Sequence, residues 1–341
     1  MNPFFKEIES KAIELSFSGV ISIFQADKEL FNKAFSLADI PNRHPNTPST
    51  KFGIASGTKL FTALGIGKLI DEERLTLQTT IHEIFQSDLT WISPQATIQH
   101  LLMHTSGIFD YYDEEVISDF DHYHVDIPWY QLETPSDYLP LFSQKPLKFH
   151  PGERFSYSNG GYICLGIIIE KITRKLYRDH IQEVVFNPAK MVDSGYFAFN
   201  NLPNNTANGY RLDKSGNHVS NIYNLPIRGA SDGGAYITTH DLRSFWDALN
   251  SNLILSEVMT TQFLSPQVNI KESLDYGYGL YISKVNDNSV FTISGSDAGV
   301  GFVSRYFPDR KLLINIISNK TDGEVGMHAF ILDQLPMIDL E

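Results

Sequence analysis

The chain has few residues that could form disulfide bonds and no long apolar run that could hold it in a membrane. It has one cysteine, Cys164, which lies within the apolar run YICLGIII (162–169). A single cysteine excludes a disulfide framework, so we interpret Cys164 as a buried, unreactive thiol. This run is the longest apolar one, and it is far too short to span a bilayer. The sequence therefore predicts neither a disulfide-rich nor a membrane-spanning protein.

Positive charge is also scarce. The chain has 27 Lys and Arg against 40 Asp and Glu, a net charge of −13, and no basic cluster stands out. A nucleic acid or an anionic membrane is therefore not an expected partner, because phosphate binding needs clustered Lys and Arg. Neither G-x-G-x-x-G nor a P-loop occurs, so no nucleotide cofactor is expected. We expect a small-molecule or peptide-like substrate as the partner; the sequence leaves the oligomeric state open.

What is present describes an ordinary folded protein. Apolar residues make up 42% of the chain, aromatic residues 12% and charged residues 20%, which excludes disordered and fibrous classes. A chain of 341 residues can bury a large core, as one domain or as two closely packed lobes. The N-terminal MNPFFKEIESKAIELSF carries acidic residues throughout and no continuous apolar segment. We interpret it as a helix rather than a signal peptide, and the cytoplasm is the expected location.

Periodicity along the chain predicts a mixed α/β fold. After the first helix, residues 19–25 and 29–37 form a predicted antiparallel hairpin. The last third contains four predicted strands and a helix, at 276–284, 289–295, 301–307, 311–319 and 323–335. Between about 75 and 200 the signals are helical or loop-like, with the clearest helix at 160–177.

This order predicts an α/β (α+β) architecture: a central antiparallel sheet flanked by the terminal helices, with an inserted all-helical lobe. We expect one domain over 1–341, with a mixed α/β lobe at about 1–75 and 205–341 and a helical lobe at about 76–204. No internal repeat, low-complexity segment or linker divides the chain.

The first candidate for chemistry is Ser56-Gly57-Thr58-Lys59, the one S-x-x-K in the sequence. Apolar residues recur at helical spacing from Leu60 onward, so Ser56 is expected at the start of an amphipathic helix that buries one face. Residues three apart share a helix face, which places Lys59 within reach of the Ser56 hydroxyl. A desolvated lysine can act as a general base, and the helix start offers free N–H groups to an oxyanion. The plainer alternative is a serine that only caps the helix.

The second candidate is Tyr157-Ser158-Asn159, which directly precedes a strongly apolar helix. A loop here could present side chains to a cleft, where a tyrosine can pass protons to a leaving group. An asparagine amide can hold a substrate amide or the lysine. Taken alone, a capping role for Ser158 or Asn159 is the simpler interpretation.

Together, these segments resemble the serine β-lactamase and penicillin-binding-protein superfamily, especially its class C-like, esterase and D,D-peptidase branch. The resemblance runs from Ser56 nearly to the C-terminus. Its segments are ASGTKLFTALGIGKLIDEERLTL, TIQHLLMHTSGIFDY (97–111), FSYSNGGYICLGIIIEKITRKLY and SDGGAYITTHDLRSF (231–245). It implies the β-lactamase/transpeptidase-like fold, with a cleft between a mixed and a helical lobe. It also implies Ser56 as acylated nucleophile, Lys59 as its activating neighbour, Tyr157 as general base or acid and Asn159 as a substrate-positioning amide.

The third motif of the family departs from its pattern here. Where members carry K-T-G or H-x-G on a strand lining the cleft, this chain has Ile293-Ser294-Gly295 in TISGSDAGVGF. Ser294 can replace the threonine hydroxyl, Gly295 leaves room for substrate, and the Ser296 N–H would join that of Ser56 as an oxyanion donor. The basic residue has become Ile293. Efficient recognition of carboxylated β-lactams is therefore not expected, unless another basic side chain, such as Arg228 or Arg305, enters the cleft in its place.

Several other residues are weaker candidates. Tyr111 and Tyr112 follow the HTSG stretch, where the family places a loop that lines the cleft, so they are possible substrate contacts. Two histidine pairs suggest a metal, but neither lies in an H-E-x-x-H pattern, and no metal is expected. These pairs are His100 with His104 and His122 with His124.

The sequence leaves two functions open. The first is a metal-free serine hydrolase that acts through an acyl-enzyme on an ester or small amide, and the intact Ser56, Lys59, Tyr157 and Asn159 favour it. The second is a penicillin-binding fold kept as a catalytically weak binding or regulatory protein, which the loss of charge at Ile293 favours.

Overall fold

A computed structural model describes residues 2–86, 91–117, 119–285 and 287–334 of the chain. Its main sheet has eight strands in the order β2-β1-β14-β13-β12-β11-β10-β9, and every neighbouring pair is antiparallel. The strands of this sheet are β1 (Gly19–Gln25), β2 (Lys28–Phe35), β9 (Val268–Lys271), β10 (Leu274–Tyr276), β11 (Tyr281–Val285), β12 (Asn288–Asp297), β13 (Val300–Phe307) and β14 (Leu312–Ser318).

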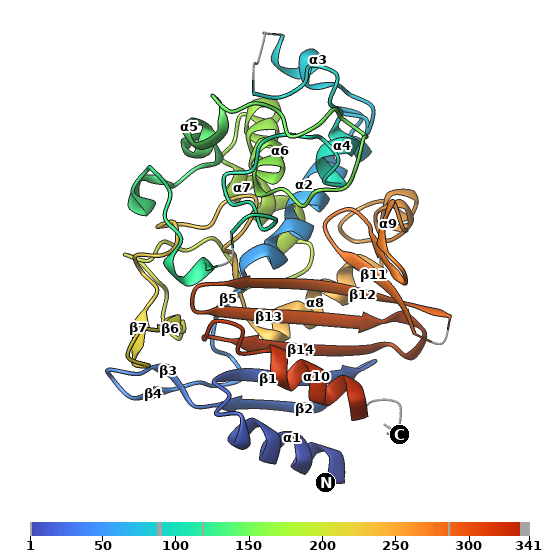
Figure 1. The fold of residues 1–341 in the computed structure, drawn as a ribbon. Helices are drawn as coiled ribbons and strands as arrows, with labels where there is room; N and C mark the ends of the chain where they lie inside the picture. The colour runs from blue at the N-terminus through green and yellow to red at the C-terminus, as the bar shows by residue number, and fades with distance from the viewer. Residues whose placement is uncertain (1, 87–90, 118, 286, 335–341) are drawn as a thin grey trace.

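Both faces of this sheet are covered, because its central strands are apolar on both sides. On β14, the side chains of Leu312 and Ile314 join the core under the helices α1 (Pro3–Glu14) and α10 (Val325–Gln334), whereas Leu313 joins the larger core on the other face. Figure 1 shows α1 and α10 against the lower part of the sheet and the other helices above or behind it. The expected sheet with flanking terminal helices is confirmed.

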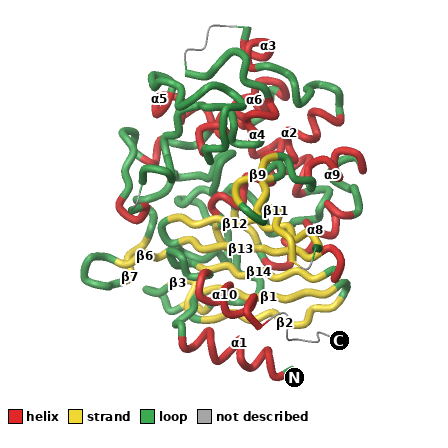
Figure 2. Tube along the Cα trace, turned by 45° about the vertical axis from the view of Figure 1, so that its right-hand side comes forward, coloured by secondary structure: helices red, strands yellow, loops and turns green. Residues whose placement is uncertain are grey.

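The remaining helices lie between β5 and β9 in the sequence. Figure 2 shows most of them as a layer of short helices and long loops above the sheet. They are α2 (Lys59–Asp71), α3 (Ile81–Phe85), α4 (Ile98–Leu102), α5 (Leu139–Phe142), α6 (Asn159–Thr173), α7 (Tyr177–Ile181), α8 (Thr239–Asn250) and α9 (Glu257–Phe263). Small two-stranded pairs join β3 (Leu37–Asp39) to β4 (His44–Pro45), β5 (Phe52–Gly53) to β8 (Tyr236–Ile237) and β6 (Tyr210–Leu212) to β7 (His218–Ser220). Within the described residues, no helix is long and apolar enough to cross a membrane.

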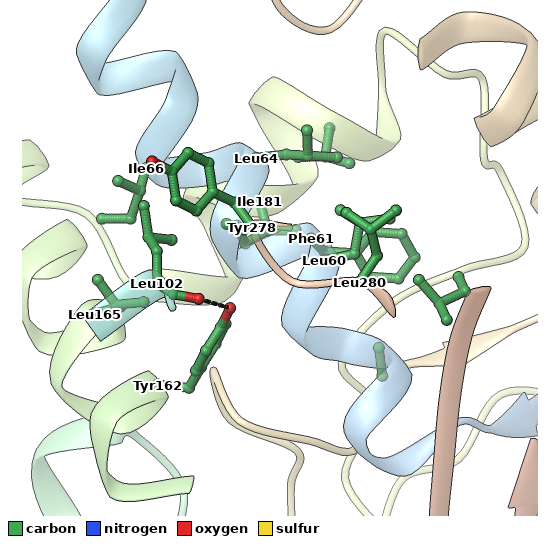
Figure 3. Packing of buried hydrophobic residues seen from close by; sticks show 14 of the residues in the cluster. Leu60, Phe61, Leu64, Ile66, Leu102, Tyr162, Leu165, Ile181, Tyr278 and Leu280 are labelled. Atoms are coloured by element: carbon green, nitrogen blue, oxygen red, sulfur yellow. Dashed lines mark hydrogen bonds between the residues drawn. The ribbon is translucent and has the colours of Figure 1, made fainter. Parts of the chain in front are cut away.

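Helix α2 lies within the main hydrophobic core. Figure 3 shows Leu60, Phe61, Leu64 and Ile66 of this helix pointing in different directions into the surrounding core. Ten of its 13 residues are buried, so the expectation of an amphipathic helix with one buried face is wrong. The sequence KLFTALGIGKLI allows this because it is apolar on all sides of the helix.

A chain of buried polar side chains crosses three strands. The Ser304 hydroxyl donates to Asn315 Oδ1 at 2.7 Å, and Asn315 Nδ2 donates to the Ser22 hydroxyl at 3.0 Å. From α8, the Trp246 indole N–H donates to Ser304 at 3.0 Å. The network therefore links β1, β14, β13 and the helix behind them, with each buried group partnered.

Element boundaries differ from expectation at two places. The strand predicted over 276–284 is two strands, because residues 277–280 form a turn in which Gly279 adopts a φ of 86°. The helix predicted over 160–177 ends at Thr173, where Arg174 takes a left-handed conformation (φ 60°) and α7 begins at Tyr177. The N-terminal hairpin and the strands after residue 288 are confirmed.

Candidate active site

Ser56 lies in a 3₁₀ turn, Ala55–Thr58, that runs directly into α2. The preceding residue, Ala55, has a left-handed backbone with φ 43°. A non-glycine residue in this region costs about 1 kcal/mol or more, so the surrounding structure must hold it there. The turn gives the half-buried Ser56 side chain a fixed position at the start of the buried helix, as the sequence predicts.

Lys59 is held directly beside Ser56. Its side chain is 1% exposed, and its Nζ lies 3.0 Å from Ser56 Oγ. The same nitrogen lies 2.7 Å from Asn159 Oδ1 and 2.7 Å from the carbonyl oxygen of Asp232. Three oxygen atoms from three distant segments thus surround one amine.

The protonation of Lys59 decides what this arrangement can do. Burial lowers the pKa of Lys59, although the carboxylates of Asp232 and Asp110, among others nearby, act in the opposite direction. A neutral amine has two N–H donors and one lone pair. It can donate to the Asn159 and Asp232 oxygen atoms, neither of which can donate in return, and then accept the hydroxyl proton of Ser56. The geometry therefore suits a base directed at Ser56.

The ring of Tyr157 lies close to the Lys59 amine. Lys59 Nζ lies 4.8 Å from the centroid of the Tyr157 ring. The loss of surrounding water raises the pKa of Tyr157 well above its usual value, while the Ser56 hydroxyl acts to lower it. The phenol therefore keeps its proton near neutral pH, which suits a proton donor better than a base.

His104 fixes the position of the Tyr157 ring. The two ring centroids are 4.3 Å apart, at an interplanar angle of 32°. His104 Nδ1 accepts the backbone N–H of Ser158 at 3.0 Å, so its other nitrogen, Nε2, carries the proton and faces the Tyr276 hydroxyl at 3.1 Å. Burial lowers the pKa of His104 well below its usual value, so the ring is neutral.

Asn159 is occupied by the protein on both ends of its amide. Its Oδ1 binds Lys59, and its Nδ2 donates to the carbonyl oxygen of Tyr112 at 2.9 Å. Asp110 accepts the backbone N–H of Asn159 at 2.8 Å and that of Gly160 at 3.0 Å, at the start of α6. Asn159 thus fixes the lysine and the neighbouring loop.

The end of β12 passes over the Ser56 turn. A Cβ atom on Gly295 would lie 2.2 Å from the Ile54 carbonyl oxygen and 2.6 Å from the backbone nitrogen of Ser56, so only glycine permits this approach. The last pair between β11 and β12 is Tyr281 with Thr292. Among the described strands, residues 293–297 therefore pair with β13 alone, which leaves the other edge of Ser294 and Ser296 open beside Ser56.

These features decide the family. A family model described as Beta-lactamase matches residues 7–334. The chain belongs to the beta-lactamase family. Together with the relatives below, this assignment supports a serine hydrolase of the superfamily of serine β-lactamases and penicillin-binding proteins, and the expected fold is confirmed.

This beta-lactamase-family chain is similar to several penicillin-binding proteins. The solved structure of a penicillin-binding protein from Bacillus halodurans is 36% identical, covers 96% of this chain and 99% of its own, and superposes with a TM-score of 0.90. Penicillin-binding protein 4* of Bacillus subtilis (strain 168) is 27% identical over 90% of this chain and 69% of its own length. Protein flp of Staphylococcus aureus (strain N315) is 30% identical, but the match spans 60% of this chain and 41% of that protein.

Two cavities meet at Ser56. One, which we call the aromatic pocket, extends toward β5 and β8 and has a volume of about 80 Å³. Its wall includes the aromatic residues Phe52, Tyr111, Tyr112, Trp129, Tyr138, Phe197, Phe199 and Tyr236. The other, which we call the acidic cavity, has a volume of about 490 Å³ and contains Tyr157, Tyr281, Ser294, Gly295 and several carboxylates. Four residues line both: Ser56, Tyr112, Ser296 and Asp297.

Tyr111 and Tyr112 both lie in this region. The Tyr111 hydroxyl donates to Asp232 Oδ2 at 2.5 Å, which ties the aromatic pocket to the turn whose carbonyl oxygen holds Lys59. The Tyr112 hydroxyl donates to Asp297 Oδ1 at 3.1 Å, and this bond joins the two walls of the cleft where the cavities meet.

Ile293 faces away from both cavities. Its side chain is 1% exposed and belongs to the main hydrophobic core. The two arginines considered as replacements for the missing charge are also elsewhere: Arg228 donates to the Tyr196 carbonyl oxygen, and Arg305 lies 3.4 Å from the Ser283 hydroxyl. Among the described residues, no lysine, arginine or histidine lines either cavity.

Histidines from both pairs contact other side chains. In the described part of the chain, no three His, Cys, Asp or Glu side chains are grouped closely enough to hold a metal ion. His100 caps its own helix by contacting Thr97, and His122 pairs with Asp119 on the surface.

Sequence reasoning missed the residues that control charge in the site. Asp110 and Asp232 act on Lys59 from separate loops, and Asp297 directly follows the predicted Ser294-Gly295-Ser296 segment. Only Asp297 carried a usable signal, because a side chain one residue beyond a substrate-binding strand edge is expected near the substrate.

Proposed function

We propose that this chain is a serine hydrolase that acylates Ser56 and acts on an ester or a small amide. One observation carries the proposal: Lys59 Nζ lies 3.0 Å from Ser56 Oγ, while two further oxygen atoms, of Asn159 and Asp232, bind the same buried nitrogen. A lysine with only a structural role would not need a serine hydroxyl, exposed to a cavity, as its third partner.

In the first step, the neutral Lys59 amine takes the proton of the Ser56 hydroxyl as Oγ attacks the substrate carbonyl carbon. Burial favours this state of Lys59, because it lowers the pKa of the amine. The carbonyl oxygen becomes an oxyanion. The backbone N–H groups of Ser56 and Ser296 are its proposed donors, and the loss of one such donor costs roughly 10²–10³ in turnover.

In the second step, the bond to the leaving group breaks and that group takes a proton. The Tyr157 phenol is the proposed donor, because it is protonated near neutral pH and stands between Lys59 and the acidic cavity. The Lys59 ammonium then restores the phenol proton. Water hydrolyses the acyl-enzyme by the reverse path, with the same groups returning their protons.

The cavities limit the substrate. The aromatic pocket suits an apolar side chain of moderate size. No basic side chain of the described residues faces a substrate carboxylate. A lost charge-assisted hydrogen bond is worth roughly 1.5–3 kcal/mol, or about 10- to 100-fold in rate or affinity. We therefore propose uncharged or cationic substrates over carboxylated β-lactams.

Labelling of Ser56 tests the proposal. Incubation with a fluorophosphonate, followed by intact mass and peptide mapping, is expected to place one adduct on Ser56. The Ser56→Ala variant is expected to lose both the adduct and the hydrolysis of p-nitrophenyl acetate. Ser251→Ala, which changes an exposed serine far from the cavities, is the matched control. Wild-type rates in Ser56→Ala would refute the assignment.

The same experiment separates the binding or regulatory alternative. A chain that only binds would show no adduct with a fluorophosphonate or a fluorescent penicillin, and no turnover. The burial of Ile293 in the core weakens that alternative. Although isoleucine stands where the family has a basic residue, Ser56, Lys59 and Tyr157 still lie together.

A further inference from the structure

The wall of the acidic cavity has charge of one sign. Six of its lining residues are carboxylic acids, and none is basic. They come from three separate segments, which are the loop before and after residue 118, the end of β12 and the turn before α10. The six are Glu114, Asp119, Asp121, Asp297, Asp322 and Glu324.

Protein cations do not neutralise this wall. Of the six acids, Asp119 alone takes part in an ion pair among the described residues, and its partner is the exposed His122. Three of the others bind neutral donors: Asp297 accepts from Tyr112, Asp121 accepts from the Thr321 hydroxyl, and Asp322 accepts from the Ser296 hydroxyl at 2.6 Å. The buried amine of Lys59 interacts with Glu114 and Asp297 of this wall, but it must be neutral to activate Ser56.

Glu324 gives a second, independent sign of a missing partner. Its side chain is 8% exposed, yet Oε2 has no hydrogen-bond partner in the described part of the chain. Burial raises the pKa of Glu324 to about 7. An unpaired buried carboxylate is costly, and an ammonium group bound in this cavity would offset part of that cost.

The other walls suit an organic cation. Tyr157 and Tyr281 line the same cavity, and aromatic faces attract ammonium groups. No three carboxylates of the described chain are close enough to hold a metal ion. The acids therefore lie along a wall instead of around a point, which fits an ammonium group on an extended molecule.

We propose that the acidic cavity binds a substrate ammonium group. The preferred substrate is then an ester or amide whose positive charge reaches this cavity when Ser56 attacks the substrate carbonyl group. This inference rests on the proposed acyl-enzyme function and adds the class of substrate to it.

Matched substrates that differ in charge test the preference. Acetylthiocholine and its neutral isostere 3,3-dimethylbutyl thioacetate place the charge on the leaving group. Alanine p-nitroanilide and N-acetylalanine p-nitroanilide, in both enantiomers, place it on the acyl group. At pH 7.5, kcat/KM is expected to be at least tenfold higher for the cation in at least one pair.

Variants then link the preference to the cavity. Glu324→Gln and Asp322→Asn are each expected to lower the cation-to-neutral ratio of kcat/KM by threefold or more. Asp322 has a left-handed backbone (φ 51°), which asparagine tolerates well, so this variant is expected to fold even if Glu324→Gln does not. Glu257→Gln removes an exposed charge on α9, outside both cavities, and is expected to leave the ratio unchanged.

A binding measurement separates this inference from the proposed function. Choline and its neutral isostere 3,3-dimethyl-1-butanol are titrated calorimetrically into Ser56→Ala, and choline is expected to bind at least tenfold more tightly. If p-nitrophenyl acetate is hydrolysed but every cation preference is below tenfold, the ammonium site is refuted and the hydrolase stands. If choline binds with that preference but Ser56 is never acylated, the ammonium site stands and the hydrolase is refuted.

Discussion

The two cavities that meet at Ser56 differ in almost every property. The aromatic pocket is smaller and has mostly aromatic and apolar walls with two aspartates, Asp232 and Asp297, whereas the acidic cavity is larger and has six carboxylic acids. They share Ser56, Tyr112, Ser296 and Asp297, so the reacting atoms would lie at the boundary between an apolar and a negatively charged region. The comparison suggests that chemistry and selectivity are separable here: shared residues would affect all substrates, and residues of one wall only some of them.

The largest expected effect comes from Lys59, which binds Ser56, a residue that lines both cavities. Lys59→Met removes the proposed base and is expected to lower kcat/KM roughly 10³-fold or more for cationic and neutral substrates alike. Lys68→Met, in the last turn of the same helix and half-buried, is the matched control and is expected to stay within twofold of wild type. Retention of one tenth of the activity in Lys59→Met, by steady-state kinetics, would contradict the proposed base.

Gly295 is the next test of the shared boundary. Gly295→Ala forces a Cβ against the Ile54 carbonyl oxygen and the Ser56 backbone nitrogen, at 2.2 and 2.6 Å. Since this displaces a proposed oxyanion donor, kcat is expected to fall about 10²-fold for every substrate. Gly161→Ala, whose Cβ would first meet an atom at 3.4 Å, is the control and is expected to keep wild-type kcat. A selective loss for one substrate class would show that Gly295 affects the acidic cavity alone and does not position a shared oxyanion donor.

A change confined to the aromatic pocket is expected to be smaller and selective. Trp129→Ala removes part of its apolar wall, and kcat/KM for p-nitrophenyl phenylacetate is expected to fall about tenfold relative to the acetate. The preference for cationic substrates should stay the same. Tyr130→Ala, at the neighbouring position that is 66% exposed, controls for the loop. Equal losses for both esters would mean that the acyl side chain does not enter this pocket.

The smallest expected effect is on stability. The pKa of Glu324 is raised to about 7 in the folded chain, against 4.5 when exposed, so its ionisation opposes folding as pH rises through this interval. Glu324→Gln is therefore expected to raise Tm by about 2 °C or more at pH 8 and to leave it unchanged at pH 4. Scanning calorimetry at both pH values measures this, with Glu257→Gln as control. A lower Tm at pH 8 would mean that the carboxylate has a partner that stabilises it.

The sequence predicted what depends on local pattern. The order of Ser56, Lys59, Tyr157 and Asn159 in their motifs was enough to expect the family, and the β-rich runs in the last third predicted β12, β13 and β14. Two short hairpins, β6–β7 and β9–β10, were missed. Helix α8 was missed as well, although Thr238 and Asp241 show the pattern of a capped helix start, and the Thr238 side chain does accept the Asp241 N–H.

What could not be predicted depends on contacts between distant segments. The acidic cavity needs the residues on either side of position 118, the end of β12 and the turn before α10 to meet. The acidic stretch at 110–126 is visible in the sequence, but its contact with the other two segments is not. The direction of the Ile293 side chain could not be predicted either, for the same reason. The family motif has a basic residue at this position, so the sequence indicated a lost charge in the site. The strand register instead directs the Ile293 side chain into the core.

The buried network of Ser22, Asn315, Ser304 and Trp246 has a consequence for the neighbouring strand β12. Ser304 is the cross-strand partner of Ile293, two positions before Gly295. If β12 slid by one residue along β13, Ser294 or Ser296 would replace the glycine above the Ser56 turn, and either side chain would collide with it. The polar groups resist any slippage that would break their bonds, and so help to keep β13 aligned with β14 and α8. These hydrogen bonds thereby help to fix β13, the strand against which β12 holds Gly295 beside the Ser56 turn.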